Sequence, residues 1–347
     1  MNKRTMLGAV ALAALVALPG QAFSEDEKKD KKRVLELGKY YPSLESGVNL
    51  SQSAYSDNWA GGDKGSIVWT WLLNGTLENQ LNKGLNWNNN LKLAFGQTHQ
   101  QDAARNWGKP DKSTDLIDYE TIFRFTRGWL VDPFVSGRFE SQFIDDSDAL
   151  GRSLNFNPLK FKETGGVARQ FIDEEDRSLL SRLGFTFRQS VRDQFSDSVD
   201  TTNTATFSQS TNDGGIEWIT DYKTKILEDR VTWTSKLSLY QPIFYSDKDN
   251  LEMISAADLT AAGLASDIAD YSTTMDIDFE NIFSAQITKI IAVNLYTRWV
   301  YDKFDNTVGT SFDEDGMLLN GTDLNRAIRK AGQFKQTLAI GVTYRFL

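Results

Sequence analysis

The C-terminal stretch of residues 336–347, QTLAIGVTYRFL, decides the fold class of this chain. Large apolar residues alternate in it with small or polar ones. Because successive side chains of a strand point to opposite faces, one face would carry Leu338, Ile340, Val342, Tyr344 and Phe346. A final strand that is apolar outward, small or polar inward and aromatic at its end is typical of bacterial outer-membrane β-barrels, which close their sheet with it. The aromatic residue here is the penultimate one, and the edge strand of a soluble β-sandwich stays open as the alternative on this stretch alone.

The same alternation recurs along the rest of the chain. Besides the last strand at 334–346 and a short first one at Val48 and Leu50, strands are expected at about 66–80, 85–98, 116–126, 131–144, 159–171, 179–191, 215–225, 230–244, 273–286 and 290–304. Short connections alternate with long ones, as periplasmic turns and extracellular loops do in a barrel with both termini in the periplasm. A sandwich has no reason to produce this order. The sequence therefore predicts an all-β, transmembrane, antiparallel up-and-down β-barrel of about 12 strands.

Two of the long loops carry helix signals, so short helices are expected in the outer loops. Ser255 predicts a capped helix over 256–262, and Thr322 predicts a second one over 323–331, each followed by a glycine. These helices either cover the mouth of the barrel or only order two long loops.

The N-terminus predicts export. Residues 1–24 combine a basic start, an apolar run too short to span a bilayer and a small-x-small cleavage site, which together are typical of a secretory signal peptide. The charged segment that follows, 25–46, is expected to be a periplasmic tether, and 47–347 the barrel. The expected location is the bacterial outer membrane, as an integral protein.

Composition excludes several classes of function. The formal net charge of −9 argues against nucleic acid as a partner, because such a partner needs a basic face. A sequence without cysteine has no lipoprotein anchor, disulfide or thiolate metal site. Acidic clusters at 145–148, 247–249 and 313–315 lack the spacing of a calcium loop and are interpreted as solvated charge, so no metal and no cofactor is expected. The expected partners are outer-membrane lipid and lipopolysaccharide, and the barrel-assembly machinery that recognises the C-terminal strand.

Parity along the predicted strands assigns charged residues to the interior. If the large apolar residues face lipid, the lumen is lined by Glu120, Arg124, Arg138, Glu140, Arg188, Lys236, Asp278, Glu280, Arg298 and Arg345. Charges on the lipid face would cost on the order of a few kcal/mol each, so their segregation supports this register. Two interpretations stay open: a salt-bridged filling, or a water-filled pore whose charged walls set ion selectivity.

Several short motifs lie between residues 49 and 143. They are LSQS at 50–53, NWAGGD at 58–63, WNN at 87–89, LAFG at 93–96, KSTD at 112–115, Trp129 and FESQF at 139–143. With these motifs the stretch resembles an uncharacterised family of envelope proteins from Bacteroidota-type bacteria, domain of unknown function 3078. The resemblance implies an outer-membrane barrel without an assigned activity. Its signature loop contains Asn58, Trp59, Gly61 and Gly62, where the glycines allow a tight turn and the tryptophan anchors it in the interface; ligand binding by this loop is the alternative.

Three functions are considered for this sequence. The first is a passive small-solute channel, or a structural barrel, with a charged lumen. The second is a surface-binding or adhesion protein that acts through its long outer loops. The third, an envelope enzyme, is disfavoured: the outer-membrane phospholipase, whose architecture is similar, uses a His-x-Ser pair, whereas the only histidine here, His99, is followed by two glutamines. The sequence therefore predicts a protein that is not an enzyme, with no catalytic residue.

Overall fold

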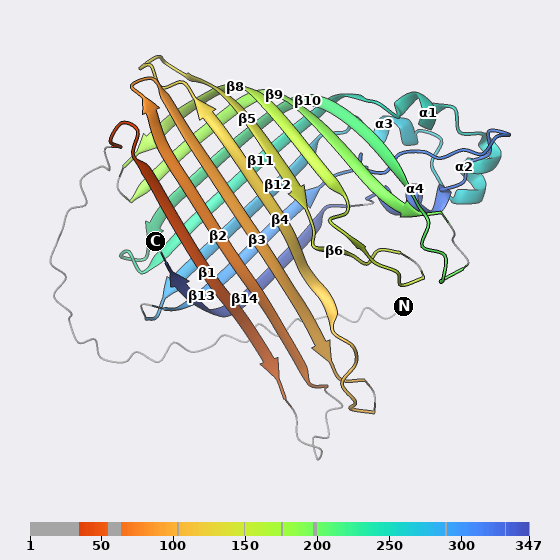
Figure 1. The fold of residues 1–347 in the computed structure, drawn as a ribbon, viewed down its shortest axis with the longest axis horizontal. Helices are drawn as coiled ribbons and strands as arrows, with labels where there is room; N and C mark the ends of the chain where they lie inside the picture. The colour runs from red at the N-terminus through yellow and green to blue at the C-terminus, as the bar shows by residue number, and fades with distance from the viewer. Residues whose placement is uncertain are drawn as a thin grey trace, which may run out of the picture. The chain divides into compact units, whose positions relative to one another are not determined.

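The computed structural model shows a closed antiparallel barrel of twelve strands (Figure 1). The structure describes residues 35–54, 64–102, 104–148, 150–174, 176–196, 200–288, 290–329 and 331–346. In order around the barrel, the strands are β1 (Tyr40–Ser53), β2 (Ser66–Asn82), β3 (Leu85–Gln100), β4 (Asp111–Arg124), β5 (Asp132–Ser141), β8 (Leu159–Asp173), β9 (Arg177–Phe195), β10 (Thr206–Ile226), β11 (Val231–Tyr245), β12 (Asp276–Gln286), β13 (Ile291–Tyr301) and β14 (Gln333–Arg345). The predicted fold class is confirmed.

The last strand closes the sheet, as its sequence predicts. β14 pairs with β13 on one side and with β1 on the other, where residues 340–345 lie opposite 45–50. This seam is shorter than the pairing of β1 with β2, which runs from Tyr40 to Ser53. The outer face of β14 is open, since the side chains of Leu338 and Ile340 are 66% and 61% exposed. An apolar outer face of this kind is what a lipid-facing wall requires.

The first strand begins earlier than the sequence predicts. β1 starts at Tyr40, inside the segment 25–46 that the sequence assigns to a tether, and it pairs with β2 from that residue onward. Pro42 and Ser46 interrupt the apolar alternation, and this interruption hides the strand. Ser46 is accommodated because its hydroxyl accepts a hydrogen bond from the indole N–H of Trp71 at 3.0 Å.

Strands β9 and β10 extend through most of residues 192–214, the stretch between the strands expected at 179–191 and 215–225. The prediction of a long loop there is wrong. The two strands pair up to Phe195 and Thr206. Polar residues occupy both faces of β10 in this region, so no apolar period marks it in the sequence. The predicted loop 145–158 contains a short hairpin as well, formed by β6 (Ile144–Asp145) and β7 (Leu154–Asn155).

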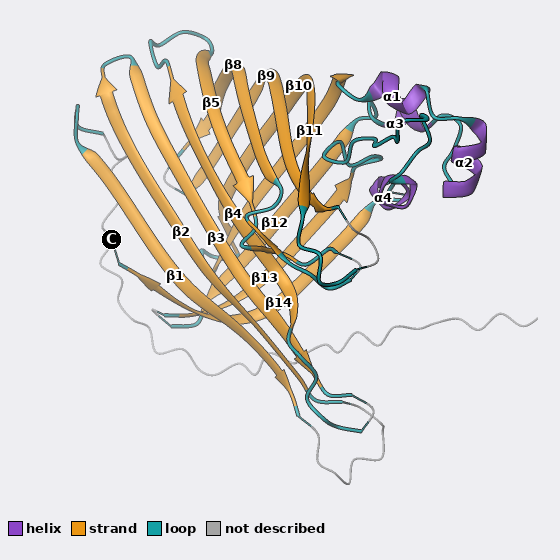
Figure 2. Ribbon diagram, turned by 45° about the vertical axis from the view of Figure 1, so that its right-hand side comes forward, coloured by secondary structure: helices purple, strands orange, loops and turns teal. Residues whose placement is uncertain are grey.

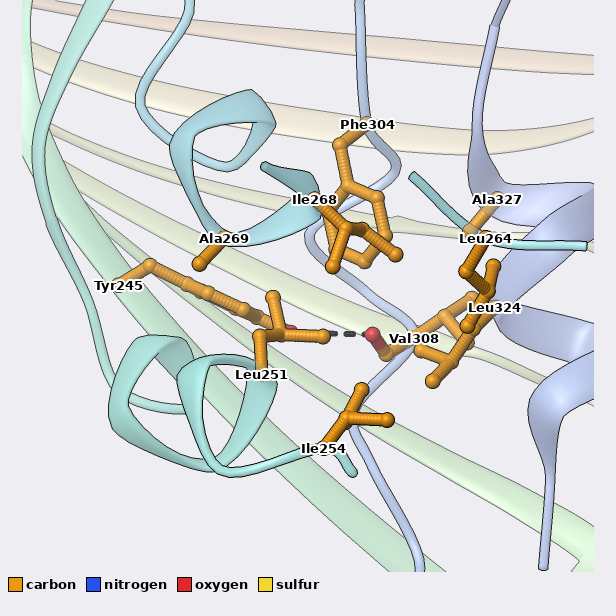
Figure 3. Packing of buried hydrophobic residues seen from close by; sticks show 10 residues of the cluster. All are labelled: Tyr245, Leu251, Ile254, Leu264, Ile268, Ala269, Phe304, Val308, Leu324 and Ala327. Carbon is orange, nitrogen blue, oxygen red and sulfur yellow. Dashed lines mark hydrogen bonds between the residues drawn. The ribbon is translucent and has the colours of Figure 1, made fainter. Parts of the chain in front are cut away.

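Among the described residues, four short helices gather at one end of the barrel (Figure 2): α1 (Lys248–Glu252), α2 (Ala256–Ala262), α3 (Ile268–Tyr271) and α4 (Gly321–Ala327). They belong to the connections 246–275 and 302–329, which together we call the cap. Buried apolar side chains give the cap a hydrophobic core (Figure 3), formed with the end of β11 by Tyr245, Leu251, Ile254, Leu264, Ile268, Ala269, Phe304, Val308, Leu324 and Ala327. In the described part of the chain, no helix is long and apolar enough to cross a membrane.

One of the two predicted helices is confirmed in detail. The helix expected over 256–262 is α2, and Ser255 Oγ accepts a backbone N–H of its first turn at 3.1 Å. The helix expected over 323–331 is only partly right, because α4 begins earlier, ends earlier and is not capped by Thr322. Asn320 precedes it, and its side chain instead accepts the backbone N–H of Ser311 at 2.9 Å. The start of α4 is therefore set by a tertiary contact rather than by a local cap.

Residues 302–311 of the cap, which we call the mouth segment, lie against the inner side of the barrel wall. Carbonyl oxygens of this segment accept hydrogen bonds from the side chains of Thr211 (2.7 Å), Gln209 (2.9 Å) and Tyr245 (3.0 Å). The cap is thus attached to β10 and β11 by a narrow strip of polar contacts.

One carboxylate lies on the outer wall of the barrel. Glu163 of β8 is exposed in a groove of about 600 Å³ whose walls include Phe123, Phe185 and Phe187. The groove is open because Gly165 has no side chain, and a Cβ built there would meet no atom within 4 Å. The segregation of charge to the lumen therefore has an exception at this position.

Candidate functional site in the lumen

Contacts between strands that are not neighbours identify the interior of the barrel. Arg182 of β9 donates to Glu120 of β4 at 3.1 Å, although β8 and β5 lie between them. Arg188 of β9 likewise reaches Asp276 of β12 at 3.1 Å across β10 and β11. Contacts of this kind span the concave side of a closed sheet, so these side chains line the lumen.

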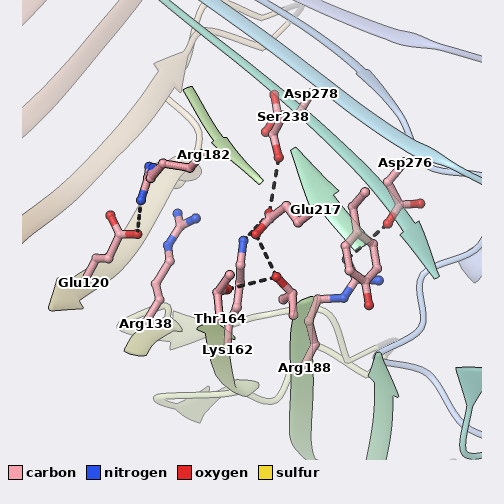
Figure 4. A network of polar contacts seen from close by, with 12 residues as sticks. Glu120, Arg138, Lys162, Thr164, Arg182, Arg188, Glu217, Ser238, Asp276 and Asp278 are labelled. Atoms are coloured by element: carbon pink, nitrogen blue, oxygen red, sulfur yellow. Dashed lines mark hydrogen bonds and ion pairs between the residues drawn. The ribbon is translucent and has the colours of Figure 1, made fainter. Parts of the chain in front are cut away.

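At one level the charged wall is tightly packed (Figure 4). The Arg182 side chain, only 8% exposed, contacts Glu120, and Lys162 of β8 is paired with Glu217 of β10. The space left among these side chains has a volume of about 10 Å³, which is room for about one water molecule. Here the ion pairs fill the space along their wall.

Other lumen charges are paired but more exposed. Arg138 of β5 contacts both oxygens of Asp118 at 2.7 and 2.9 Å and lies 3.2 Å from Glu140. Arg298 of β13 likewise donates to both carboxylate oxygens of Asp278 of β12, at 2.9 and 2.7 Å. The side chains of this last pair are 44% and 39% exposed, so water and solutes reach them.

Small residues line a row of the lumen on the opposite side. Residues paired across a sheet share a face, and Ala292 lies on the same face of β13 as Arg298. From β13 the row continues through the seam to β3 by direct pairing, as Ala292, Gly341, Asn49, Thr70 and Gly96. We call this row the small-residue wall, in contrast to the charged wall formed by β4, β5 and β8 to β13. The side chains of this row are small, and those of Asn49 and Thr70 lie over Gly341 and Gly96.

A cavity of about 280 Å³ lies between the charged wall and the mouth segment. The wall contributes side chains that include Lys160, Ser190 and Arg298, and the mouth segment contributes Asp302 and Asn306. We call it the mouth cavity. Within the described ranges, no group of three or more histidine, aspartate or glutamate side chains is arranged to hold a metal ion.

Two carboxyl groups of the mouth segment have pKa values shifted in opposite directions. Burial raises the pKa of Asp302 to about 6; nearby Asp305 adds to this rise, and Arg188 and Arg329 oppose it. Burial would also raise the pKa of Asp305, but the charge of Lys160 and hydrogen bonds within its own segment hold it below its usual value. At neutral pH both groups are therefore charged. Their surroundings stabilise the charged form of Asp305 and destabilise the charged form of Asp302.

Most of the predicted lumen residues lie on the charged wall. Those that form the ion pairs above are Glu120, Arg138, Glu140, Arg188, Asp278 and Arg298. Glu280 accepts a hydrogen bond from the hydroxyl of Tyr296 at 3.0 Å, and Lys236 stands opposite both Glu280 and Asp221 in the strand register. A role of these residues in selectivity stays a prediction.

The remaining predicted residues lie apart or outside the described side chains. Arg124 is 3.9 Å from Asp132, next to the β4–β5 turn. Arg345 lies in β14, but its side chain is outside the described part of the structure. The signature loop with Asn58, Trp59, Gly61 and Gly62 also falls outside the described residues. His99 lies in β3 rather than in a long loop, with its ring 5.1 Å from that of Trp107.

Several charged residues of the lumen are missing from the sequence prediction. They are Asp118, Lys162, Arg182, Asp213, Glu217, Asp221 and Asp276. Asp118, Arg182 and Asp276 have the same parity as the predicted residues of their strands. Lys162, Glu217 and Asp221 have the parity opposite to the exposed apolar residues of β8 and β10, so the alternation alone would have found these six. Asp213 is different, because it falls in the stretch of β10 that the sequence marks as a loop.

Comparison with known proteins gives a family of unknown function and a set of barrels. The model of the family described as "Protein of unknown function (DUF3078)" matches residues 50–146, which confirms the resemblance to this domain; the attribution to Bacteroidota-type bacteria stays a prediction. A search of curated proteins gave no match.

Among solved structures, three similar ones are all bacterial barrels. An outer membrane channel from Pseudomonas putida F1 is 9% identical, with 91% of this chain and 98% of that one covered and a TM-score of 0.37. The translocator domain of the autotransporter NalP from Neisseria meningitidis is 8% identical, with 88% of each chain covered and a TM-score of 0.35. The NanC porin is 9% identical, with 87% and 98% covered and a TM-score of 0.33. The fold assignment itself rests on the strand pairing of this chain.

Proposed function

We propose that this protein is an outer-membrane barrel that acts as a passive channel for small polar solutes. The observation that carries the proposal is the division of the lumen into a charged wall and a small-residue wall. A barrel whose ion pairs served only as filling would be expected to bring large side chains from all sides to its axis. In this chain, Gly341 and Gly96 bring no side chain to the row that faces the charged wall, and the proposed path runs along this row.

The outer wall supports a membrane location. Apolar side chains such as Leu338, Leu183 and Phe185 are about half exposed or more, a costly arrangement in water and a favourable one in lipid. The tightly packed level around Arg182 and Lys162 narrows the path, so the solutes are small. Charged side chains exposed beside the path, above all Arg298 and Asp278, would set its ion selectivity.

Single-channel recording of the refolded protein in a planar bilayer tests this proposal. Wild type is expected to give stable conductance steps. The Arg298→Ala variant removes a positive charge beside the path and leaves Asp278 unpaired, so the reversal potential in a salt gradient should shift toward cation selectivity. Arg177→Ala is the matched control, because Arg177 is also paired with one carboxylate, Glu174, but lies outside the lumen at a short turn. It should leave the reversal potential unchanged.

A barrel that is correctly folded, as judged by its mobility on unheated gels, and that never conducts would overturn the channel. An equal shift in Arg298→Ala and Arg177→Ala would show that the lumen charge does not set selectivity.

The cap favours a second candidate, a surface-binding protein. A loop region with its own hydrophobic core presents a fixed surface, as binding loops on rigid scaffolds do. This candidate predicts that deletion of residues 256–264, which contain α2, abolishes binding to a cell or matrix surface, whereas Arg298→Ala has no effect on it.

A further inference from the structure

The mouth cavity has an excess of hydrogen-bond acceptors at its outer end. Asp302 is a lining residue, and in the described structure its side chain accepts one hydrogen bond, from the backbone N–H of Phe304 at 3.2 Å. The two guanidinium groups near it are engaged elsewhere: Arg188 with Asp213 and Asp276, and Arg329 with Asp305. Asp302 thus lies beside further carboxylates without a cation of its own.

Two neutral side chains of the cavity add to this excess. The amide of Asn306 donates to the carbonyl of Ser272 at 3.0 Å, but its Oδ1 accepts no hydrogen bond. Ser190 Oγ also has no partner. Both residues line the cavity and are more than nine-tenths buried, with exposed fractions of 9% and 6%. Buried polar atoms without partners are rare in native proteins, because each has lost its hydrogen bonds to water without gaining others.

The shape and chemistry of the cavity together define a ligand. Its volume of about 280 Å³ holds a small organic molecule rather than a single ion. At the outer end, around Asp302 and Asn306, the two nearby guanidinium groups, of Arg188 and Arg329, are already paired with other carboxylates. On the wall side, Lys160 lies next to Ser190 in the strand register and forms no direct ion pair among the described residues. A ligand that supplies N–H donors and a positive charge at one end complements this arrangement.

We propose that the mouth cavity binds a small solute that carries a protonated primary amine. The ammonium group would lie against the carboxylate of Asp302, and a carboxylate on the same molecule would reach Lys160. An anion without an amine fits the outer end poorly, because the carboxylates of Asp302, Asp276 and Asp305 repel it there. The ring of Tyr240, which lines the cavity, is covered by Arg188 at 3.8 Å and offers no free face on which a sugar could stack.

This site names a solute class for the proposed channel and to that extent rests on it. Binding can nevertheless be measured without conduction. A barrel that conducts without binding amines would refute the amine site and leave the proposed channel intact. A barrel that binds amines without conducting would refute the channel and leave the amine site intact.

The experiment is isothermal titration calorimetry of the full-length refolded protein in detergent at pH 7.5. The protein is titrated with glycine and, separately, with 1,4-diaminobutane. Acetate and 1-propanol serve as probes without an amine. Saturable heat is expected with at least one amine and with neither of the other probes. Asp302→Asn should weaken amine binding at least tenfold. Asp315→Asn is the matched control, a neutralised aspartate in the same connection that is exposed and does not line the cavity, and it should change nothing.

The Lys160→Ala variant distinguishes an amine that also carries a carboxylate from one that does not. It should weaken the binding of glycine and leave that of 1,4-diaminobutane unchanged or stronger, because only glycine has a carboxylate for the lysine. The proposal is wrong if neither amine binds, if acetate or 1-propanol binds as well as the amines, or if Asp302→Asn and Asp315→Asn have equal effects.

Discussion

The substitution Arg182→Met should destabilise the barrel strongly, although it removes no apolar contact. The guanidinium of Arg182 lies 3.1 Å from Glu120 and 3.2 Å from Asp221, so a single side chain joins β9 to β4 on one side and to β10 on the other. Methionine keeps most of the volume and none of the charge. The variant therefore leaves two lumen carboxylates without their cation.

The size of the effect follows from burial. At an effective dielectric constant of about 20, two charges 3.1 Å apart attract by about 5 kcal/mol, and much of this is offset by the cost of removing them from water. Breaking a buried ion pair by removing one partner typically costs about 3–5 kcal/mol. Asp221 is 38% exposed and regains water in the variant, but Glu120 is only 20% exposed and regains less. We therefore expect the lower end of the range, about 3 kcal/mol.

Urea titration of the protein folded into lipid vesicles, followed by tryptophan fluorescence, measures this loss. Arg177→Met is the matched control on the same strand, because Arg177 is 47% exposed and its pair with Glu174 contributes about 0–1 kcal/mol. The double variant Arg182→Met with Glu120→Gln should recover part of the loss, since it removes the buried uncompensated charge.

A loss below about 1 kcal/mol in Arg182→Met, or one no larger than in Arg177→Met, would refute the reasoning. It would mean that water fills this level of the lumen and screens the charges, so that the ion pairs contribute little to stability.

Three further predictions test other parts of the molecule. Leu324→Ala, at a fully buried position in the cap core, should destabilise the cap by about 2–5 kcal/mol; protease cleavage within the cap should increase while the urea midpoint of the barrel stays unchanged. The mouth segment should be more protected from protease at pH 4 than at pH 7.5. The folded-state pKa of Asp302, about 6, lies above the unfolded value of about 3.9, so the mouth segment loses stability as pH rises from about 3.9 to about 6. Asp302→Asn should remove this loss, because the other charged groups that face the position, Asp276, Asp305, Arg188 and Arg329, are the same in both proteins. Glu163→Gln should raise the stability of the barrel in vesicles by about 1 kcal/mol, because it removes a carboxylate from the outer wall, and an unchanged midpoint would place Glu163 outside the lipid.

The sequence predicts the barrel well because one physical rule governs it. A strand with lipid on one side and lumen on the other must alternate, and the alternation of residues 336–347 is visible without any knowledge of partners. The rule fails where a strand leaves this environment. The outer part of β10 has polar residues on both faces: its inner face contacts the mouth segment, and Thr206, Ser208 and Ser210 on its outer face are exposed, so it resembles a loop.

The lumen is predictable in composition and not in connectivity. Parity assigns Arg138 and Arg298 to the interior from sequence alone. That Arg182 contacts Glu120 depends on the closure of the barrel and the stagger of its strands, which bring together two residues 62 positions apart. The cap is hidden for a similar reason: its core combines residues of two separate connections, and the sequence pattern does not show that these connections pack against each other.

The uneven lumen has a mechanical consequence. Ion pairs join strands β4, β5 and β8 to β13 across the curvature of the sheet, so this part of the barrel resists changes of cross-section. The seam between β14 and β1 is held by a short run of paired residues, 45–50 against 340–345, and its inner side carries Glu45, Gly47, Asn49, Gly341 and Thr343. Deformation of the barrel is therefore expected to concentrate at this seam, which would act as a hinge in an otherwise stiff cylinder. Fast amide exchange at 340–345 would be its signature.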